Sequence, residues 1–101
     1  MRMLVEIKIP TERFNVALRD GTADQTMQQI LAETQPEAVY FSPRDGQRGV
    51  TLIVDMTDPS QIPALAEPWF LKFDATVSIQ PIMSKEDLQK AGLDQLAKKW
   101  S

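Results

Sequence analysis

Four segments of the chain carry apolar residues at every second position, and this pattern limits the possible folds more than any other feature. They are residues 3–9, 37–42, 49–56 and 74–82. Alternation at period two indicates a β-strand that buries one face. The first and second segments are separated by residues with helical apolar spacing, as are the third and fourth. The predicted order is therefore β-α-β-β-α-β, followed by a further helix at the C-terminus.

The first connection contains a possible break. Residues 11–19 and 22–34 both have helical spacing, and Asp20-Gly21 interrupts them. Thr22 and Gln25 have the spacing of a capping box, in which Thr22 would be the N-cap of a second helix. A single kinked helix is the alternative, and the sequence does not separate the two.

The second and third strands should form a hairpin. Asp45-Gly46 lies in the connection between them, and this dipeptide favours a type I′ turn because both central positions need positive φ. A two-residue turn at this point predicts three cross-strand pairs: Arg44 with Gln47, Tyr40 with Thr51, and Val39 with Leu52.

The remaining helices have recognisable boundaries. Asp58-Pro59 predicts an N-cap followed by proline in the first turn, and Pro68 should end or kink that helix before Trp69-Phe70. Ser84 and Asp87 predict the cap of one C-terminal helix. Its apolar positions are Leu88, Leu93, Leu96 and Trp100.

Taken together, these elements predict a single α+β domain over residues 1–101. The order matches the ferredoxin-like βαββαβ unit, a four-stranded antiparallel sheet with both helices on one face, plus an extra C-terminal helix. A chain of 101 residues can bury about two-thirds of its unfolded surface, which is enough for an unaided core.

The two faces of the predicted sheet differ. One set of alternate residues is wholly apolar and should face the helices: Val5, Ile7, Ile9, Val39, Phe41, Val50, Leu52, Val54, Ala75, Val77 and Ile79. The other set is mixed: Leu4, Glu6, Lys8, Ala38, Tyr40, Ser42, Thr51, Ile53, Asp55, Thr76, Ser78 and Gln80. The mixed face is where we expect any function. It can be a solvated face, a homodimer interface, or a surface for single-stranded RNA.

Composition narrows these choices. Eleven basic and fourteen acidic residues give a net charge of −3, which argues against nucleic acid and anionic membranes as partners. The segment after Arg48-Gly49 has aliphatic residues where an RNA-binding sheet needs aromatic ones. The chain has no cysteine and no histidine, so we expect no metal and no cofactor. No apolar stretch approaches the ~20 residues of a membrane helix, and the N-terminus lacks a signal-peptide core, so we expect a cytoplasmic protein.

The strand order and the mixed face resemble the dimeric α+β barrel superfamily, and the chain is most similar to its small uncharacterised bacterial families. The residues that carry the resemblance are 3–9, Asp45-Gly46 and 62–70. That superfamily includes small monooxygenases of the antibiotic-biosynthesis type and muconolactone isomerases. The resemblance implies homodimerisation through the mixed face, with a ligand held between sheet and helices or within the barrel. It is a resemblance of architecture and carries no catalytic signature.

Glu6, Lys8 and Asp55 form the best candidate polar cluster. Glu6 and Lys8 lie one pleat apart, and the resemblance places the first and third strands side by side, which would bring Asp55 near Glu6. A buried carboxylate with a raised pKa could act as a general base, so Glu6 and Asp55 are the catalytic candidates. The competing interpretation is a surface ion pair of little energetic value.

Three further residues are candidates for ligand binding. Tyr40 offers a phenol and Ser78 a hydroxyl, although both could instead make cross-strand or dimer contacts. Trp69 could wall a pocket or belong to the core.

Two functions follow from these residues. The favoured hypothesis is a non-catalytic homodimeric module that binds a small ligand or another protein. The alternative is a cofactor-independent enzyme, similar to the monooxygenases or isomerases, with its site between sheet and helices. The absence of histidine weighs against catalysis, since the resemblance implies histidine in many of those enzymes.

Overall fold

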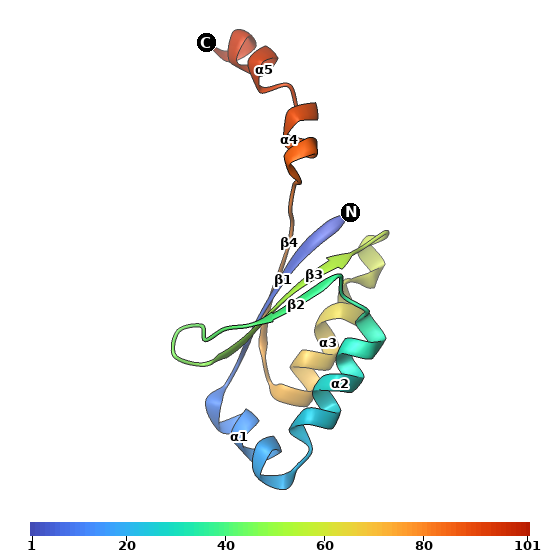
Figure 1. Ribbon diagram of the computed structural model, residues 1–101, viewed down its shortest axis with the longest axis vertical. Coiled ribbons are helices and arrows are strands. Elements are labelled where there is room, and N and C mark those ends of the chain that lie inside the picture. Colours follow the sequence, from blue (N-terminus) through green and yellow to red (C-terminus); the bar gives the residue numbers. More distant parts are fainter.

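A computed structural model describes residues 1–101 as a four-stranded antiparallel sheet with two helices along one face and a third beyond one end of the sheet (Figure 1). The strands are β1 (Arg2–Ile9), β2 (Ala38–Phe41), β3 (Arg48–Asp55) and β4 (Thr76–Pro81). The helices are α1 (Thr11–Asp20), α2 (Ala23–Thr34), the short 3₁₀ turn η1 (Pro59–Gln61), α3 (Ile62–Phe73), α4 (Lys85–Lys90) and α5 (Leu93–Trp100). The predicted α+β class and the antiparallel sheet are confirmed.

The strands follow the order β2-β3-β1-β4, so β1 and β3 are central neighbours and β2 and β4 are the edges. The hairpin between β2 and β3 is correct as predicted: Asp45 and Gly46 have φ of 51° and 75°. The three predicted pairs are present, with Arg44 opposite Gln47, Tyr40 opposite Thr51 and Val39 opposite Leu52. Local turn chemistry alone therefore sets this register.

The first connection contains two helices, one of the two alternatives that the sequence leaves open. Gly21 adopts φ 82° and donates its N–H to the carbonyls of the last turn of α1. The predicted Thr22 capping box is wrong. The Thr22 backbone N–H and hydroxyl both donate to Asp20 Oδ1, at 2.9 and 2.6 Å. Thr22 has helical backbone angles, φ −97° and ψ −11°, and its hydroxyl accepts no backbone N–H of α2. The local turn with Asp20 orients the Thr22 side chain instead.

The second connection begins with the predicted cap. Asp58 Oδ1 accepts the Ser60 N–H at 2.8 Å, and Pro59 follows in the first turn. The helix does not end at Pro68, however, but continues to Phe73. Trp69 and Phe73 lie on one side of that last stretch and are fully buried, so core packing outweighs the missing proline N–H.

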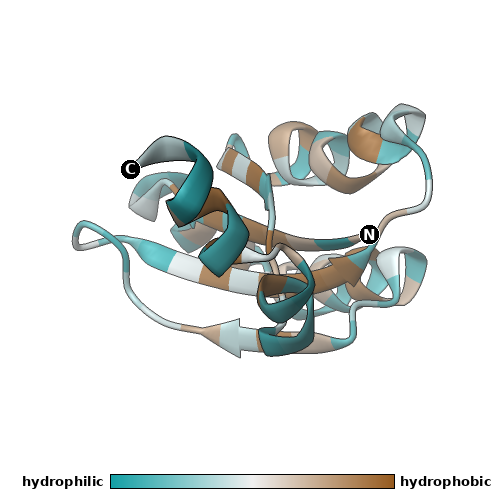
Figure 2. Ribbon diagram, turned by 90° about the horizontal axis from the view of Figure 1, so that it is seen from above, coloured by the Kyte–Doolittle hydropathy of each residue, from teal (hydrophilic) through white to brown (hydrophobic).

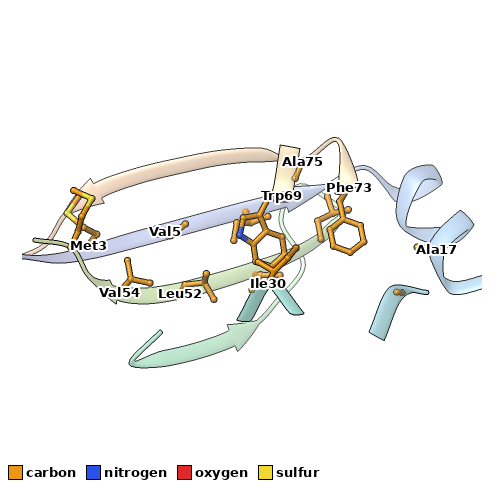
Figure 3. Packing of buried hydrophobic residues seen from close by; sticks show 14 residues of the cluster. Met3, Val5, Ala17, Ile30, Leu52, Val54, Trp69, Phe73 and Ala75 are labelled. Carbon is orange, nitrogen blue, oxygen red and sulfur yellow. The ribbon is translucent and has the colours of Figure 1, made fainter. Parts of the chain in front are cut away.

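The core lies between the sheet and α1–α3. Trp69 and Phe73 belong to one buried cluster with β-strand residues such as Val5 and Leu52, and Trp69 lies beside Ile30 (Figure 3). The predicted apolar face is the core face, with one exception. Phe41 is 63% exposed, because it lies at the end of the edge strand β2, beyond the cover of the helices.

The C-terminal segment departs from the prediction of one helix. The Ser84–Asp87 capping box is confirmed, with Ser84 N donating to Asp87 Oδ2 at 3.0 Å and Asp87 N donating to Ser84 Oγ at 3.1 Å. Gly92 adopts φ 71° and divides the segment into α4 and α5. We call residues 82–101 the C-terminal arm. It extends the molecule to 59 Å, with a radius of gyration of 17.0 Å against about 13 Å for a compact chain of this length.

None of the helices combines the length and the apolar character needed to cross a bilayer.

Candidate functional site

The sheet face opposite the helices is uncovered, and we call it the open face. It carries the mixed residues of the sequence pattern, including half-buried Leu4 and Ile53 and the exposed Tyr40. Two ion pairs cross it: Arg44 Nη1 to Glu6 Oε2 at 3.3 Å, and Lys8 Nζ to Asp45 Oδ2 at 3.5 Å. Arg44 also donates to the Thr51 hydroxyl. The charged groups of this face are therefore already partnered within one chain.

The structure does not bring Glu6, Lys8 and Asp55 together. Glu6 lies opposite Thr51, whereas Asp55 lies opposite Arg2, four residues further along the pair of strands. At about 3.3 Å per residue this separates them by about 13 Å. Asp55 instead accepts the N-terminal ammonium of Met1 at 2.9 Å. The prediction that these side chains form one cluster is wrong, because strand alternation determines which face of the sheet a residue is on but not how far along the strand it lies.

The other candidates occupy three different environments. Tyr40 is 64% exposed on the open face. Ser78 is exposed on β4, directly opposite Glu6 of β1. Trp69 is 0% exposed and belongs to the core, and its Nε1 has no hydrogen-bond partner. Trp69 is therefore a core residue and does not line an open pocket.

A pocket that the sequence did not single out lies between α1, the start of α2 and the β2–β3 hairpin. Its volume is about 470 Å³, and seven of its twelve lining residues are hydrophobic. Those seven are Ile9, Phe14, Leu18, Ala23, Met27, Phe41 and Val50. A groove of similar volume between α2 and α3, about 450 Å³, has only three hydrophobic residues among ten. The first pocket is the better candidate site because ligand pockets are mainly apolar with a few placed polar groups.

Two charged residues line this pocket, Arg48 and Asp24. The Arg48 guanidinium lies over the Phe14 ring, 4.8 Å from its centroid, and donates to Asn15 Oδ1 at 2.9 Å. It has no carboxylate partner within 4.0 Å, although four other ion pairs involve side-chain cations. Asp24 accepts from Gln28 at 3.2 Å. The pocket therefore holds one oriented cation, free to bind an anionic group.

Sequence reasoning missed Phe41 and Arg48 for different reasons. Phe41 follows the core alternation, and only its place at the end of a short edge strand exposes it. Arg48 is the first residue of β3 and belongs to no motif of an anion-binding site. The resemblance implies a ligand between sheet and helices or within the barrel, and it names no residue of this pocket.

Three carboxyl groups have shifted pKa values, and all three stabilise helix ends. Hydrogen bonds from the Thr22 side chain and backbone lower the pKa of Asp20. Ser60 lowers the pKa of Asp58 in the same way, and the Ser84 backbone and side chain lower that of Asp87. None of the three lines the pocket, so these shifts serve the fold and not a proton-transfer site.

Comparison with solved structures supports the fold alone. The chain is similar to the uncharacterized protein TM1266 from Thermotoga maritima, with a TM-score of 0.53 and 14% identity over 81% of this chain and 95% of that one. The de novo designed protein Ferredog-Diesel gives a TM-score of 0.46 and 14% identity over 80% of this chain and 85% of that one. None of the curated proteins matches. A family model described as a domain of unknown function, DUF3303, matches residues 1–96, and the chain therefore belongs to that family.

Proposed function

We propose that this protein is a homodimeric, non-catalytic module that binds a small apolar ligand with an anionic end. The observation that carries the proposal is the pocket between α1, α2 and the hairpin, with its apolar walls and its one unpaired cation. Its volume of about 470 Å³ lies within the range of small-molecule sites.

The walls of the pocket favour an apolar body. Phe14, Met27 and Phe41 face it from three different elements, α1, α2 and β2. Phe41 is largely exposed without a ligand, so covering its ring is a source of binding energy, about 25 cal/mol for each Å² removed from water.

Arg48 favours an anionic end. Its guanidinium is held on two sides, by the Phe14 ring and by Asn15. An oriented guanidinium binds a carboxylate or sulfonate by charge-assisted hydrogen bonds with little further loss of side-chain freedom. Asp24, at the other charged position, disfavours a second anionic group.

The open face supports the dimer. Leu4, Ile53 and Tyr40 offer apolar surface, while the ion pairs Glu6–Arg44 and Lys8–Asp45 let the face be covered without an unpaired charge. The strand order β2-β3-β1-β4 with helices on one face supports a ferredoxin-like fold and, with a second copy, a dimeric α+β barrel. A cytoplasmic, cofactor-free protein is part of the same proposal.

A cofactor-independent enzyme is the alternative, since the pocket lies where such a site would be. We favour binding over catalysis because Asp24 and Arg48 are the only charged groups of the pocket. Asp24 accepts one hydrogen bond, from the Gln28 amide, and an amide donor favours the carboxylate without taking up a proton from it. Turnover of any ligand that binds, lost in Asp24→Asn, would favour the enzyme.

The test is titration with 1-anilinonaphthalene-8-sulfonate, a dye with an apolar body and one sulfonate. We expect one saturable site per chain. Arg48→Gln should weaken binding at least about tenfold, the cost of a charge-assisted hydrogen bond. Arg19→Gln removes a cation of α1 that does not line the pocket and should leave binding unchanged.

A second matched pair uses the exposed aromatic residues of β2. Phe41→Ser should lower dye affinity, whereas Tyr40→Ser should leave it unchanged in the monomer and weaken the dimer seen by light scattering. Both residues are about equally exposed, so their effects on stability should be similar. Equal loss of dye binding in both variants, or in both arginine variants, would contradict the assignment of the pocket.

A further inference from the structure

We propose that the C-terminal arm of each chain packs on the open face of a second copy, with the apolar side of α5 against the β2 margin around Tyr40. The proposal rests on the proposed homodimer and extends it by naming the segment that closes the interface.

α5 has one apolar side and one polar side. Leu93, Leu96, Ala97 and Trp100 recur at i, i+3, i+4 and i+7, the spacing of a helix that docks into a partner surface. The other side carries Asp94, Gln95, Lys98 and Lys99. Trp100 is 76% exposed, and neither α4 nor α5 has a buried residue. Figure 2, which colours the ribbon by hydropathy, shows both hydrophilic and hydrophobic segments near the C-terminus.

The chain's own body does not cover this apolar side. Figure 1 shows α4 and α5 beyond the end of the sheet, clear of α1–α3. Ile82 N donates to the Arg2 carbonyl at 3.1 Å, and the Ser84 cap fixes the start of α4 two residues later. The end of β4 therefore sets the direction of the arm, and the arm leads away from the core.

Helices this short need a partner. α4 has six residues and α5 eight, and isolated helices below about 12–15 residues are marginal in water. All side-chain hydrogen bonds of residues 84–101 stay within the arm. Packing on another surface is the source of stability that such helices normally have.

A second copy supplies a matching surface. The arm holds four lysines and three acidic residues, whereas residues 1–81 hold seven basic and eleven acidic ones, so the arm of one chain is attracted to the body of another. The eight residues of α5 span about 12 Å as helix, and the four residues of β2 span about 13 Å, so α5 is long enough to cover the β2 margin. Reciprocal exchange about a twofold axis closes the assembly at two chains.

The first experiment compares Leu96→Lys with Gln95→Lys by light scattering across a concentration series. Both variants add one positive charge to α5, on the apolar and polar sides respectively. We expect Leu96→Lys to raise the dissociation constant of the dimer about thirtyfold, as for a central interface residue, and Gln95→Lys to leave it nearly unchanged. Equal dissociation constants for the two variants would overturn the proposal.

The second experiment uses the absence of cysteine from the chain. A chain carrying Leu96→Cys is mixed with one carrying Tyr40→Cys, or with one carrying Leu71→Cys, an equally accessible control on α3. We expect a disulfide-linked dimer with Tyr40→Cys and little with Leu71→Cys. Preference for Leu71→Cys, or no preference, would overturn the docking site. An intramolecular disulfide in Leu96→Cys/Tyr40→Cys, with no dimer of doubled mass, would show that the arm folds back on its own chain.

The experiments distinguish a failure of the docked arm from a failure of the proposed homodimer. A dimer that survives Leu96→Lys refutes the arm and leaves the dimer and pocket in place. A wild-type monomer at all concentrations refutes both the arm and the dimer, while the dye titration still judges the pocket alone.

Discussion

Replacing Gly49 with alanine tests whether close packing inside the β2–β3 hairpin shapes the pocket. Gly49 is buried in β3, and its carbonyl accepts the Ser42 N–H at 3.1 Å. A Cβ at this position would collide with the Ser42 carbonyl oxygen and lie 2.8 Å from Arg44 Cγ. The Ser42 oxygen belongs to the backbone, so relief requires the two strands to separate locally.

The cost follows from these contacts. Overpacking a well-packed site costs about 1–3 kcal/mol, and weakening one hairpin hydrogen bond adds about 1 kcal/mol. We therefore expect Gly49→Ala to lower the free energy of unfolding by about 2–4 kcal/mol, a large share of the 5–15 kcal/mol typical of a domain. Gly46→Ala is the control in the same hairpin. Gly46 has φ 75° and open space around its Cα, so only the left-handed backbone is penalised, at about 1–2 kcal/mol.

Urea unfolding at a fixed, low protein concentration measures both variants, and equal m-values would show that only native stability has changed. Ser42 and Gly49 line the pocket, so Gly49→Ala should also weaken dye binding, whereas Gly46→Ala should not. The reasoning is refuted if Gly49→Ala costs no more than Gly46→Ala, or if it is destabilised but binds dye with wild-type affinity.

Two further predictions concern stability. Leu52→Ala should lower the free energy of unfolding by about 2–5 kcal/mol at any protein concentration, because Leu52 is fully buried. Leu4→Ala, on the open face, should lower it less in dilute samples and more at concentrations where the dimer forms. Thermal unfolding measured over a series of protein concentrations distinguishes the two variants. Hydrogen bonds from Ser60 hold the pKa of Asp58 below its ordinary value of 3.8. These bonds therefore contribute fully to the stability of the fold above pH 3.8, and this contribution is lost as the pH falls through the lower pKa that Asp58 has in the folded state. Asp58→Asn should leave the stability at neutral pH unchanged, since asparagine also caps helices, and should lose less stability than the wild type below pH ~4. Urea unfolding from pH 7 to 2 measures this, and the same pH dependence in variant and wild type would contradict it.

Local chemistry explains which parts of the fold were predictable. Asp45-Gly46 fixes a turn, the turn fixes the register of β2 on β3, and all three predicted pairs follow. Ser84 and Asp58 cap helices by bonds to residues two or three positions away. Such features depend on a few neighbouring residues, which a single sequence displays in full.

The errors arise where distant or competing interactions decide. The register of β1 on β3 depends on a crossover of two helices, so Glu6 and Asp55 share a face without meeting. The Thr22 hydroxyl donates to Asp20, and Thr22 has helical backbone angles instead of the extended ones of an N-cap. A glycine such as Gly92 is tolerated within helices, so sequence alone did not divide α4 from α5. Pocket residues were missed because Phe41 follows the core pattern up to the point where the helices stop.

The position of β2 connects the pocket with the proposed dimer, and this gives one more testable consequence. Tyr40 and Phe41 are neighbours in an edge strand of four residues, one facing the open face and the other the pocket. A ligand that packs on Phe41 and a second chain that packs on Tyr40 both order the same short strand, so whichever binds first lowers the ordering cost of the other. We therefore expect the dye to lower the dissociation constant of the dimer. Each dimer holds two dye sites, so linkage requires saturating dye to lower the dimer dissociation constant by the square of the factor by which dimerisation raises the dye affinity of each site. Titrating dye at protein concentrations above and below the dimer midpoint measures the per-site factor. A dimer dissociation constant that saturating dye leaves unchanged would contradict the coupling and would show that β2 is already fully ordered in the single chain.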